Sequence, residues 1–87
     1  MAAKDVAEWM VEFMGQDYWL YQEIVVYEIR DRFGEDYVYI NESGNLAISR
    51  AVLREFRKLT EGKLVWERGE RAWRPARLDE AGKRTAD

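Results

Sequence analysis

Apolar residues recur at helical spacing in three stretches of the chain, and the first lies near the N-terminus. Asp5 is followed three residues later by Glu8, an order typical of a capping box with Asp in place of Ser or Thr. Gly15 stands where a helix favours a left-handed terminal residue. The pattern predicts a helix between Asp5 and Gly15. Its apolar stripe consists of Val6, Trp9, Met10, Phe13 and Met14.

The second stretch predicts a helix over residues 22–33. Several of its apolar residues are β-branched, which lowers helix propensity. Glu28 and Arg32 are four residues apart and can pair on a helix surface, and Gly34 provides a stop. These signals outweigh the β-branched residues. The expected inner face consists of Val25, Ile29 and Phe33, with Tyr21 and Val26 beside it.

The third stretch, Ser49 to Glu61, is the most strongly amphipathic one. Ser49 is a favourable N-cap, and Gly62 is a favourable C-terminal stop. At about 100° per residue, three arginines fall within an arc of roughly 60° opposite the apolar side. One face of this helix can therefore be buried while the other carries positive charge. The apolar side consists of Ile48, Val52, Phe56 and Leu59, and the arginines are Arg50, Arg54 and Arg57.

A two-stranded hairpin, residues 63–76, is predicted to follow the third helix. Residues 64–66 and 72–74 are strand-like and flank a turn centred on residues 68–69. Pro75 lies at the end of the second strand, where a missing backbone donor does little harm. The strand register stays open, because hairpin loops of about two to five residues all fit this spacing.

Residues 35–48 lack helical spacing. Residues 37–40 are strand-like in composition, and residues 45–48 are suited to return as a second short strand. The alternative is a long structured loop. The intervening Asn41-Glu42-Ser43-Gly44 is turn-like, and its first three residues also match the glycosylation sequon. We interpret them as a turn, because nothing in the chain signals secretion.

These elements predict one small domain over residues 1–77, followed by a flexible tail over residues 78–87. Eighty-seven residues are too few to build two hydrophobic cores. Residues 16–20 connect the first two helices, and we expect short extended structure over residues 19–21. The predicted fold class is α+β: a three-helix core with a C-terminal β-hairpin.

The composition excludes several classes of function. The chain has no cysteine and no histidine, which excludes disulfides, zinc fingers and catalysis by thiolate or imidazole. It has no glycine-rich phosphate loop, and its serines and threonines have no histidine to activate them. Glu8 with Glu12 could be a catalytic carboxylate pair and Glu35 with Asp36 a cation site, but solvated surface explains both. We expect no enzymatic activity, no cofactor and no metal.

The sequence also bears on location. No apolar run approaches the roughly 20 residues that span a bilayer. The N-terminus lacks the basic segment and following apolar segment of a secretory signal. The absence of cysteine fits a reducing compartment. We therefore expect a cytoplasmic protein with no membrane partner.

Charge is distributed unevenly along the chain. The formal net charge is −3, with −7 over residues 1–44, +5 over residues 45–77 and −1 over the last ten residues. A domain polarised in this way could meet a polyanion with its basic face. It could equally meet the acidic half of a second copy, so the charge pattern alone leaves both partners open.

The predicted order of helix, short extended piece, helix, helix and two-stranded hairpin resembles the winged helix-turn-helix family. The resemblance covers residues 4–76 and rests on the helix Ser49-Arg-Ala-Val-Leu-Arg-Glu-Phe-Arg-Lys-Leu and on the wing strands Leu64-Val65-Trp66 and Trp73-Arg74. Residues 35–48 depart from the family, since they are longer than the usual tight turn. The chain also resembles a set of small bacterial proteins, which implies a shared fold but supplies no information on activity.

In winged-helix proteins the third helix enters the DNA major groove, and the wing contacts the backbone or minor groove. Arginine suits both guanine and phosphate contacts. Acidic residues on the same elements, Glu55, Glu67 and Glu70, would meet phosphate unfavourably. The residues that the resemblance implies for nucleic-acid contact are Arg50, Arg54, Arg57, Lys58, Arg68 and Arg71.

The aromatic residues suggest a different contact. We expect Trp9, Phe13, Phe33 and Phe56 in the core, and Trp66 and Trp73 between the hairpin and the third helix. Trp19 belongs to no apolar stripe, so it is a candidate interface anchor, with Tyr18 and Tyr39 beside it. The alternative is that Trp19 caps the core from the connector. Residues 37–40 could also offer a free strand edge to another chain.

Two functions follow from these patterns. The first is a small non-catalytic interaction domain that binds a protein partner or a second copy of itself. The alternative is a DNA-binding winged-helix protein that uses the 49–61 helix and the 63–76 hairpin.

Overall fold

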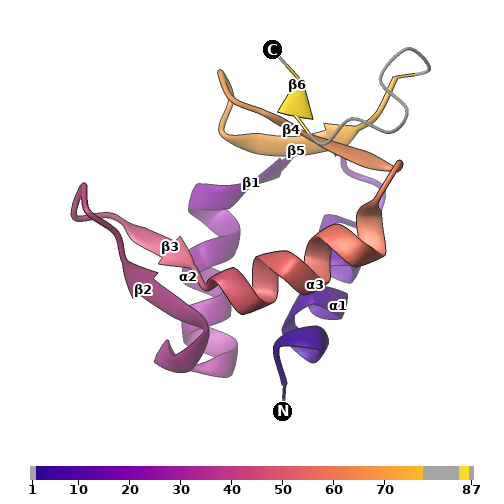
Figure 1. Cartoon of the computed structure of the whole chain (residues 1–87). Helices are drawn as coiled ribbons and strands as arrows, with labels where there is room; N and C mark the ends of the chain where they lie inside the picture. Colours follow the sequence, from indigo (N-terminus) through magenta and orange to yellow (C-terminus); the bar gives the residue numbers. More distant parts are fainter. Residues whose placement is uncertain (1, 78–84, 87) are drawn as a thin grey trace.

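The computed structural model describes residues 2–77, 85 and 86, and it confirms the α+β class (Figure 1). Three α-helices and the C-terminal hairpin lie where the sequence patterns predict them. The helices are α1 (Ala3–Met14), α2 (Gln22–Phe33) and α3 (Arg50–Thr60), with a 3-10 turn η1 (Glu35–Tyr37). The strands are β1 (Leu20–Tyr21), β2 (Val38–Ile40), β3 (Leu46–Ile48), β4 (Leu64–Glu67), β5 (Ala72–Pro75) and β6 (Thr85–Ala86).

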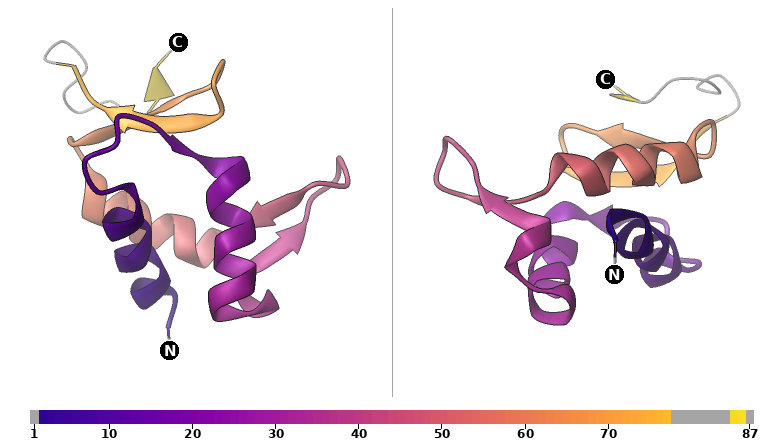
Figure 2. Two further views of the ribbon diagram at one scale, coloured as in Figure 1. Left: turned by 180° about the vertical axis from the view of Figure 1, so that it is seen from behind. Right: turned by 60° about the horizontal axis from the view of Figure 1, so that its bottom comes forward.

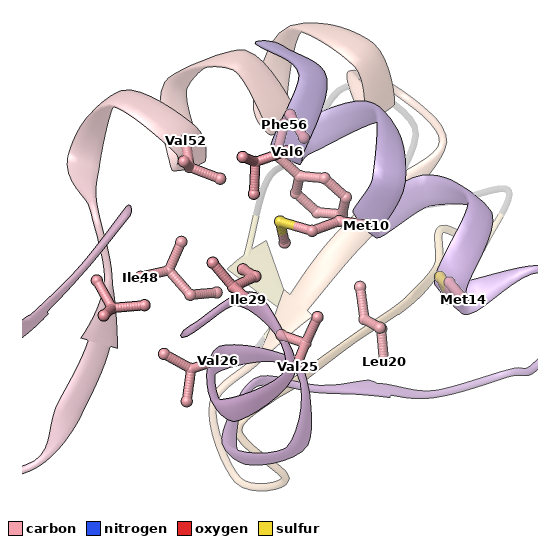
Figure 3. Close-up of a cluster of buried hydrophobic side chains, with 12 residues drawn as sticks. Val6, Met10, Met14, Leu20, Val25, Val26, Ile29, Ile48, Val52 and Phe56 are labelled. Carbon is pink, nitrogen blue, oxygen red and sulfur yellow. The ribbon is translucent and has the colours of Figure 1, made fainter. Parts of the chain in front are cut away.

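The core lies between the three helices, and α1 packs closely along α3. Figure 3 shows side chains from α1, α2 and α3 pointing toward one another. Phe56 of α3 is fully buried and meets Trp73 of β5 edge to face, with ring centroids 5.1 Å apart. This contact ties the helices to the sheet. The fully buried helix residues include Val6, Met10, Val25, Ile29, Val52 and Phe56.

The larger sheet brings together segments that are far apart in the sequence. Its strand order is β1-β5-β4-β6, with β1, β5 and β4 antiparallel and β6 parallel to β4. Trp66 lies opposite Trp73 in the β4–β5 hairpin, and Leu20 of β1 lies on the other side of Trp73. Within the predicted tail 78–87, only residues 85 and 86 are described, and they form β6.

Strands β2 and β3 form a second, separate hairpin that extends away from the helices (Figures 1 and 2). This confirms the short strands expected within residues 37–40 and 45–48, rather than a long loop. The Asn41 side chain holds the turn, because its Oδ1 accepts hydrogen bonds from the backbone N–H groups of Ser43 and Asn45, each at 3.0 Å. Val38 and Ile48 belong to the core cluster and attach this hairpin to it.

Two expectations about α1 are wrong. The helix begins at Ala3, so Asp5 is inside its first turn rather than at the N-cap. The Asp5 carboxylate instead accepts a hydrogen bond from the Ala2 N–H at 2.8 Å. Asp5 therefore occupies the N3 position of a capping box, with Ala2 as the N-cap. Phe13 is on the apolar stripe but is exposed, because it lies in the last turn and stacks on Trp9 rather than entering the core.

The start of α3 agrees with prediction. Ser49 is its N-cap, and the Ser49 hydroxyl accepts a hydrogen bond from the Val52 N–H at 3.4 Å. The helix ends at Thr60, one residue before the expected end, and Gly62 follows with a φ of 76°. The next element, the β4–β5 hairpin, has a four-residue loop in which Arg71 also has a positive φ, 53°.

Candidate interaction surfaces

A hollow lined by apolar and aromatic side chains lies where the end of α1, the connector, β1 and the first turn of α2 meet. We call it the aromatic groove. One carboxylate, Asp17, stands among its lining residues, and all the others are apolar or aromatic. The lining residues are Phe13, Met14, Asp17, Trp19, Leu20, Tyr21 and Ile24.

The groove has a buried floor and exposed walls. Met14 and Leu20 form the floor, and both belong to the core cluster (Figure 3). The walls are far more open: Ile24 is 56% exposed, Tyr21 38% and Phe13 37%. Fully burying one such side chain contributes about 1.5–3 kcal/mol. Because these walls are already partly buried, a partner that covered them would gain roughly a third to a half of this value for each side chain.

Trp19 is held between two tyrosines. Its ring meets Tyr18 edge to face at 5.1 Å and tilts toward Tyr21 at 6.0 Å. Trp19 is largely buried, whereas Tyr18 is 49% exposed. Of these two tyrosines, Tyr21 lines the groove together with Trp19, and Tyr18 lies outside its lining.

Tyr39, the third predicted interface residue, does not line the groove. It lies on β2 of the projecting hairpin and is exposed together with its neighbour Ile40. The structure thus places Tyr18 and Trp19 side by side and puts Tyr39 on a different element.

The arginines of α3 lie on a basic surface, in contrast to the apolar groove. Arg50, Arg54 and Arg57 are all exposed. A shallow hollow is lined by Arg54, Arg57, Lys58 and Glu61. Lys58 is not a free cation, because its Nζ lies 3.4 Å from the Glu55 carboxylate.

The loop of the β4–β5 hairpin contributes separately. Arg71 lines a third hollow, together with Glu70 and residues from α2, and shares no lining residue with the basic hollow of α3. Its carbonyl accepts a hydrogen bond from the Gln22 N–H at 3.1 Å, which attaches the loop to the start of α2. Arg68 is exposed on the same loop.

Sequence reasoning missed Ile24 as a surface residue, although its position carried a signal. At about 100° per residue, Ile24 falls roughly 140° from Ile29 around α2, outside the inner stripe. An isoleucine off the inner stripe of a helix is a reason to look for other exposed apolar residues beside it. Tyr27, also exposed on α2, lies under Arg30, whose guanidinium stands 5.0 Å from the ring centre.

Within residues 2–77, 85 and 86, no group of three or more carboxylates is placed to hold a metal ion. None of the helices described is both long and apolar enough to cross a membrane.

Comparison with known proteins identifies a family and no activity. No curated protein and no solved structure matches the chain. One family model matches residues 2–75, which include α1 to α3 and the β4–β5 hairpin. The chain therefore belongs to this family, the family of unknown function DUF6953.

Proposed function

We propose that this chain is a non-catalytic protein-interaction domain and that the aromatic groove is its contact surface. The observation that carries the proposal is the exposure of Ile24, at 56%, beside a floor that is continuous with the core. Exposed apolar side chains that are grouped around one hollow make it a candidate site of interaction. Absence of catalysis is proposed on the chain's composition, since it has neither histidine nor cysteine.

The aromatic contacts around Trp19 support the same proposal. Tryptophan and tyrosine are enriched among the residues that dominate binding energy at interfaces. Trp19 is already positioned by Tyr18 and Tyr21, so binding would order few additional side-chain torsions. A preformed anchor of this kind lowers the entropic cost of association.

Site-specific photo-crosslinking in the source organism tests the proposal. A benzoylphenylalanine replaces Ile24 in one variant and Trp19 in another, and the control carries it at Lys63, an exposed position outside the groove. We expect discrete adducts from both groove positions and none from the control. Adducts of twice the chain mass identify a second copy, whereas other masses identify a foreign partner. Equal labelling at all three positions, or none at the groove, would refute the proposal.

DNA binding is the second candidate, and the exposed arginines of α3 favour it. The order α1-β1-α2-α3-β4-β5, with β1 paired to β5, supports the resemblance to winged-helix domains. The hairpin β2–β3, inserted between α2 and α3, and the acidic side chains of Glu55 and Glu70 weigh against it. These features leave it behind the protein-interaction function.

A titration with mixed-sequence duplex DNA at low salt tests this second candidate. If α3 binds the duplex, affinity should fall steeply as salt rises, because bound counterions are released. Arg54→Ala and Arg57→Ala should each weaken binding and reduce the salt dependence. Lys4→Ala, which removes an exposed cation from α1, is the control. Absence of binding to the duplexes at low salt would eliminate DNA as the partner.

A further inference from the structure

The surface around the aromatic groove is acidic. Residues 5–29 contain six carboxylates and no lysine or arginine. Asp17 lines the groove itself, Glu12 precedes the wall residue Phe13, and Glu23 precedes Ile24. All three of these acidic residues are exposed. The groove therefore has an apolar interior, one carboxylate in its lining and two more that are next in sequence to its walls; we call Glu12, Asp17 and Glu23 the acidic rim.

The carboxylates beside the groove lack ion-pair partners within the described part of the chain. None of Glu12, Asp17 and Glu23 forms an ion pair there. The two arginines that follow on α2 are already engaged: Arg32 lies 2.9 Å from Glu28, and Arg30 lies 3.5 Å from Asp31. Arg71 is the cation in the neighbouring hollow, which also contains Glu23 and Glu70.

From this arrangement we infer that the groove binds a segment of another protein whose apolar anchors are flanked by lysine or arginine. The inference rests on the proposed function and specifies the partner's chemistry. Apolar anchors would fill the space beside Ile24 and Trp19, where burial supplies affinity. Basic flanks would pair with the carboxylates of the rim, which supplies charge complementarity and faster association.

A second copy of this chain fits the groove less well. Two-fold pairing through the groove would place the rim carboxylates of one copy against those of the other, since a two-fold contact uses the same patch twice. Head-to-tail pairing would present the basic face of α3 to the groove. The exposed residues of that face, Arg50, Arg54, Arg57 and Lys58, offer no large apolar side chain to fill it. A foreign segment can carry both features together.

Fluorescence anisotropy with three labelled synthetic peptides tests the inference. The peptides share one stripe of leucine and tryptophan and differ only in their remaining positions, which are lysine, glutamine or glutamate. We expect the lysine peptide to bind roughly tenfold more tightly than the glutamine peptide at low salt, because several exposed ion pairs each contribute a few-fold. The glutamate peptide should bind weakest. High salt should remove the difference between the peptides.

A pair of charge variants locates the effect. The rim variant, Glu12→Gln with Asp17→Asn and Glu23→Gln, should lose the preference for lysine while keeping its affinity for the glutamine peptide. The matched control removes the same three charges elsewhere, as Glu35→Gln with Asp36→Asn and Glu42→Gln, all of them exposed residues outside the groove. It should behave as the unmodified protein does.

The outcomes separate the inference from the proposed function. Equal binding of the three peptides, or equal effects of the two charge variants, would overturn the inference. So would absence of peptide binding together with specific cross-links from position 24, which would leave the interaction function standing with a different partner chemistry. Absence of both peptide binding and cross-links would remove the proposed function as well.

Discussion

Two isoleucines on the same helix offer a matched test of where the core ends and the contact surface begins. Ile24 and Ile29 both lie on α2, but Ile29 is fully buried whereas Ile24 is 56% exposed and lines the aromatic groove. Ile24→Ala and Ile29→Ala remove the same atoms from the same kind of backbone. Any difference between the two variants must therefore come from their surroundings.

The structure sets the expected magnitudes. Truncating a buried isoleucine to alanine costs about 2–5 kcal/mol, through lost burial and the cavity left behind, and Ile29 belongs to this class. Less than half of the Ile24 side chain is buried, so its truncation to alanine costs about 1 kcal/mol at most. Alanine also has the better helix propensity, which offsets the loss of stability by up to about 0.5 kcal/mol at either position. Ile24→Ala should thus be nearly neutral for folding.

Urea unfolding followed by far-UV circular dichroism measures these free energies, and thermal unfolding provides a check. In a domain of this size about 1 kcal/mol shifts the melting temperature by roughly 4–8 °C. Ile29→Ala should lower it by roughly 10 °C or more and Ile24→Ala by less than about 5 °C. Peptide binding and cross-linking should show the reverse order, with Ile24→Ala impaired. Similar losses of stability in both variants would refute the assignment of Ile24 to a free surface.

Three further predictions concern the scaffold that holds the groove. Phe56→Ala should cost about 3–5 kcal/mol of unfolding free energy in urea titrations, because Phe56 is buried and meets Trp73 of the sheet; a loss below about 1 kcal/mol would contradict this packing. Ser49→Ala should cost about 0.5–1 kcal/mol, since the hydroxyl caps α3 at the Val52 N–H, and Ser49→Asp should restore most of it. Gly34→Ala should cost about 1–3 kcal/mol through its φ of 97°, with no steric clash contributing, and an unchanged melting temperature would refute this strain.

The connection between β1 and the C-terminal hairpin shows where sequence reasoning stops. Two extended residues, Leu20 and Tyr21, are enough to predict a short strand, but nothing local specifies their partner. The structure pairs them with Trp73 and Ala72, which are about fifty residues away in the chain. That pairing brings the hairpin loop to the start of α2, where the Gln22 N–H donates a hydrogen bond to the Arg71 carbonyl.

The three helices and both hairpins could be predicted from the sequence because their signals are local. Helical spacing, the N-cap at Ser49, glycine stops and strand-like pairs around turns act between residues a few positions apart. The candidate residues of the basic face were found in the same way, since Arg50, Arg54 and Arg57 share one side of a helix whatever surrounds it.

Burial and pairing depend instead on where neighbouring elements begin and end. Phe13 continues the apolar stripe of α1 yet is exposed at the end of its helix. Ile24 is a wall of the groove because residues of the connector and β1 line the same hollow. Helical periodicity specifies the direction of a side chain around its own axis, but only the packing of distant segments specifies what lies in that direction. For this reason the aromatic groove and its acidic rim became visible in the folded chain and not in the pattern of residues.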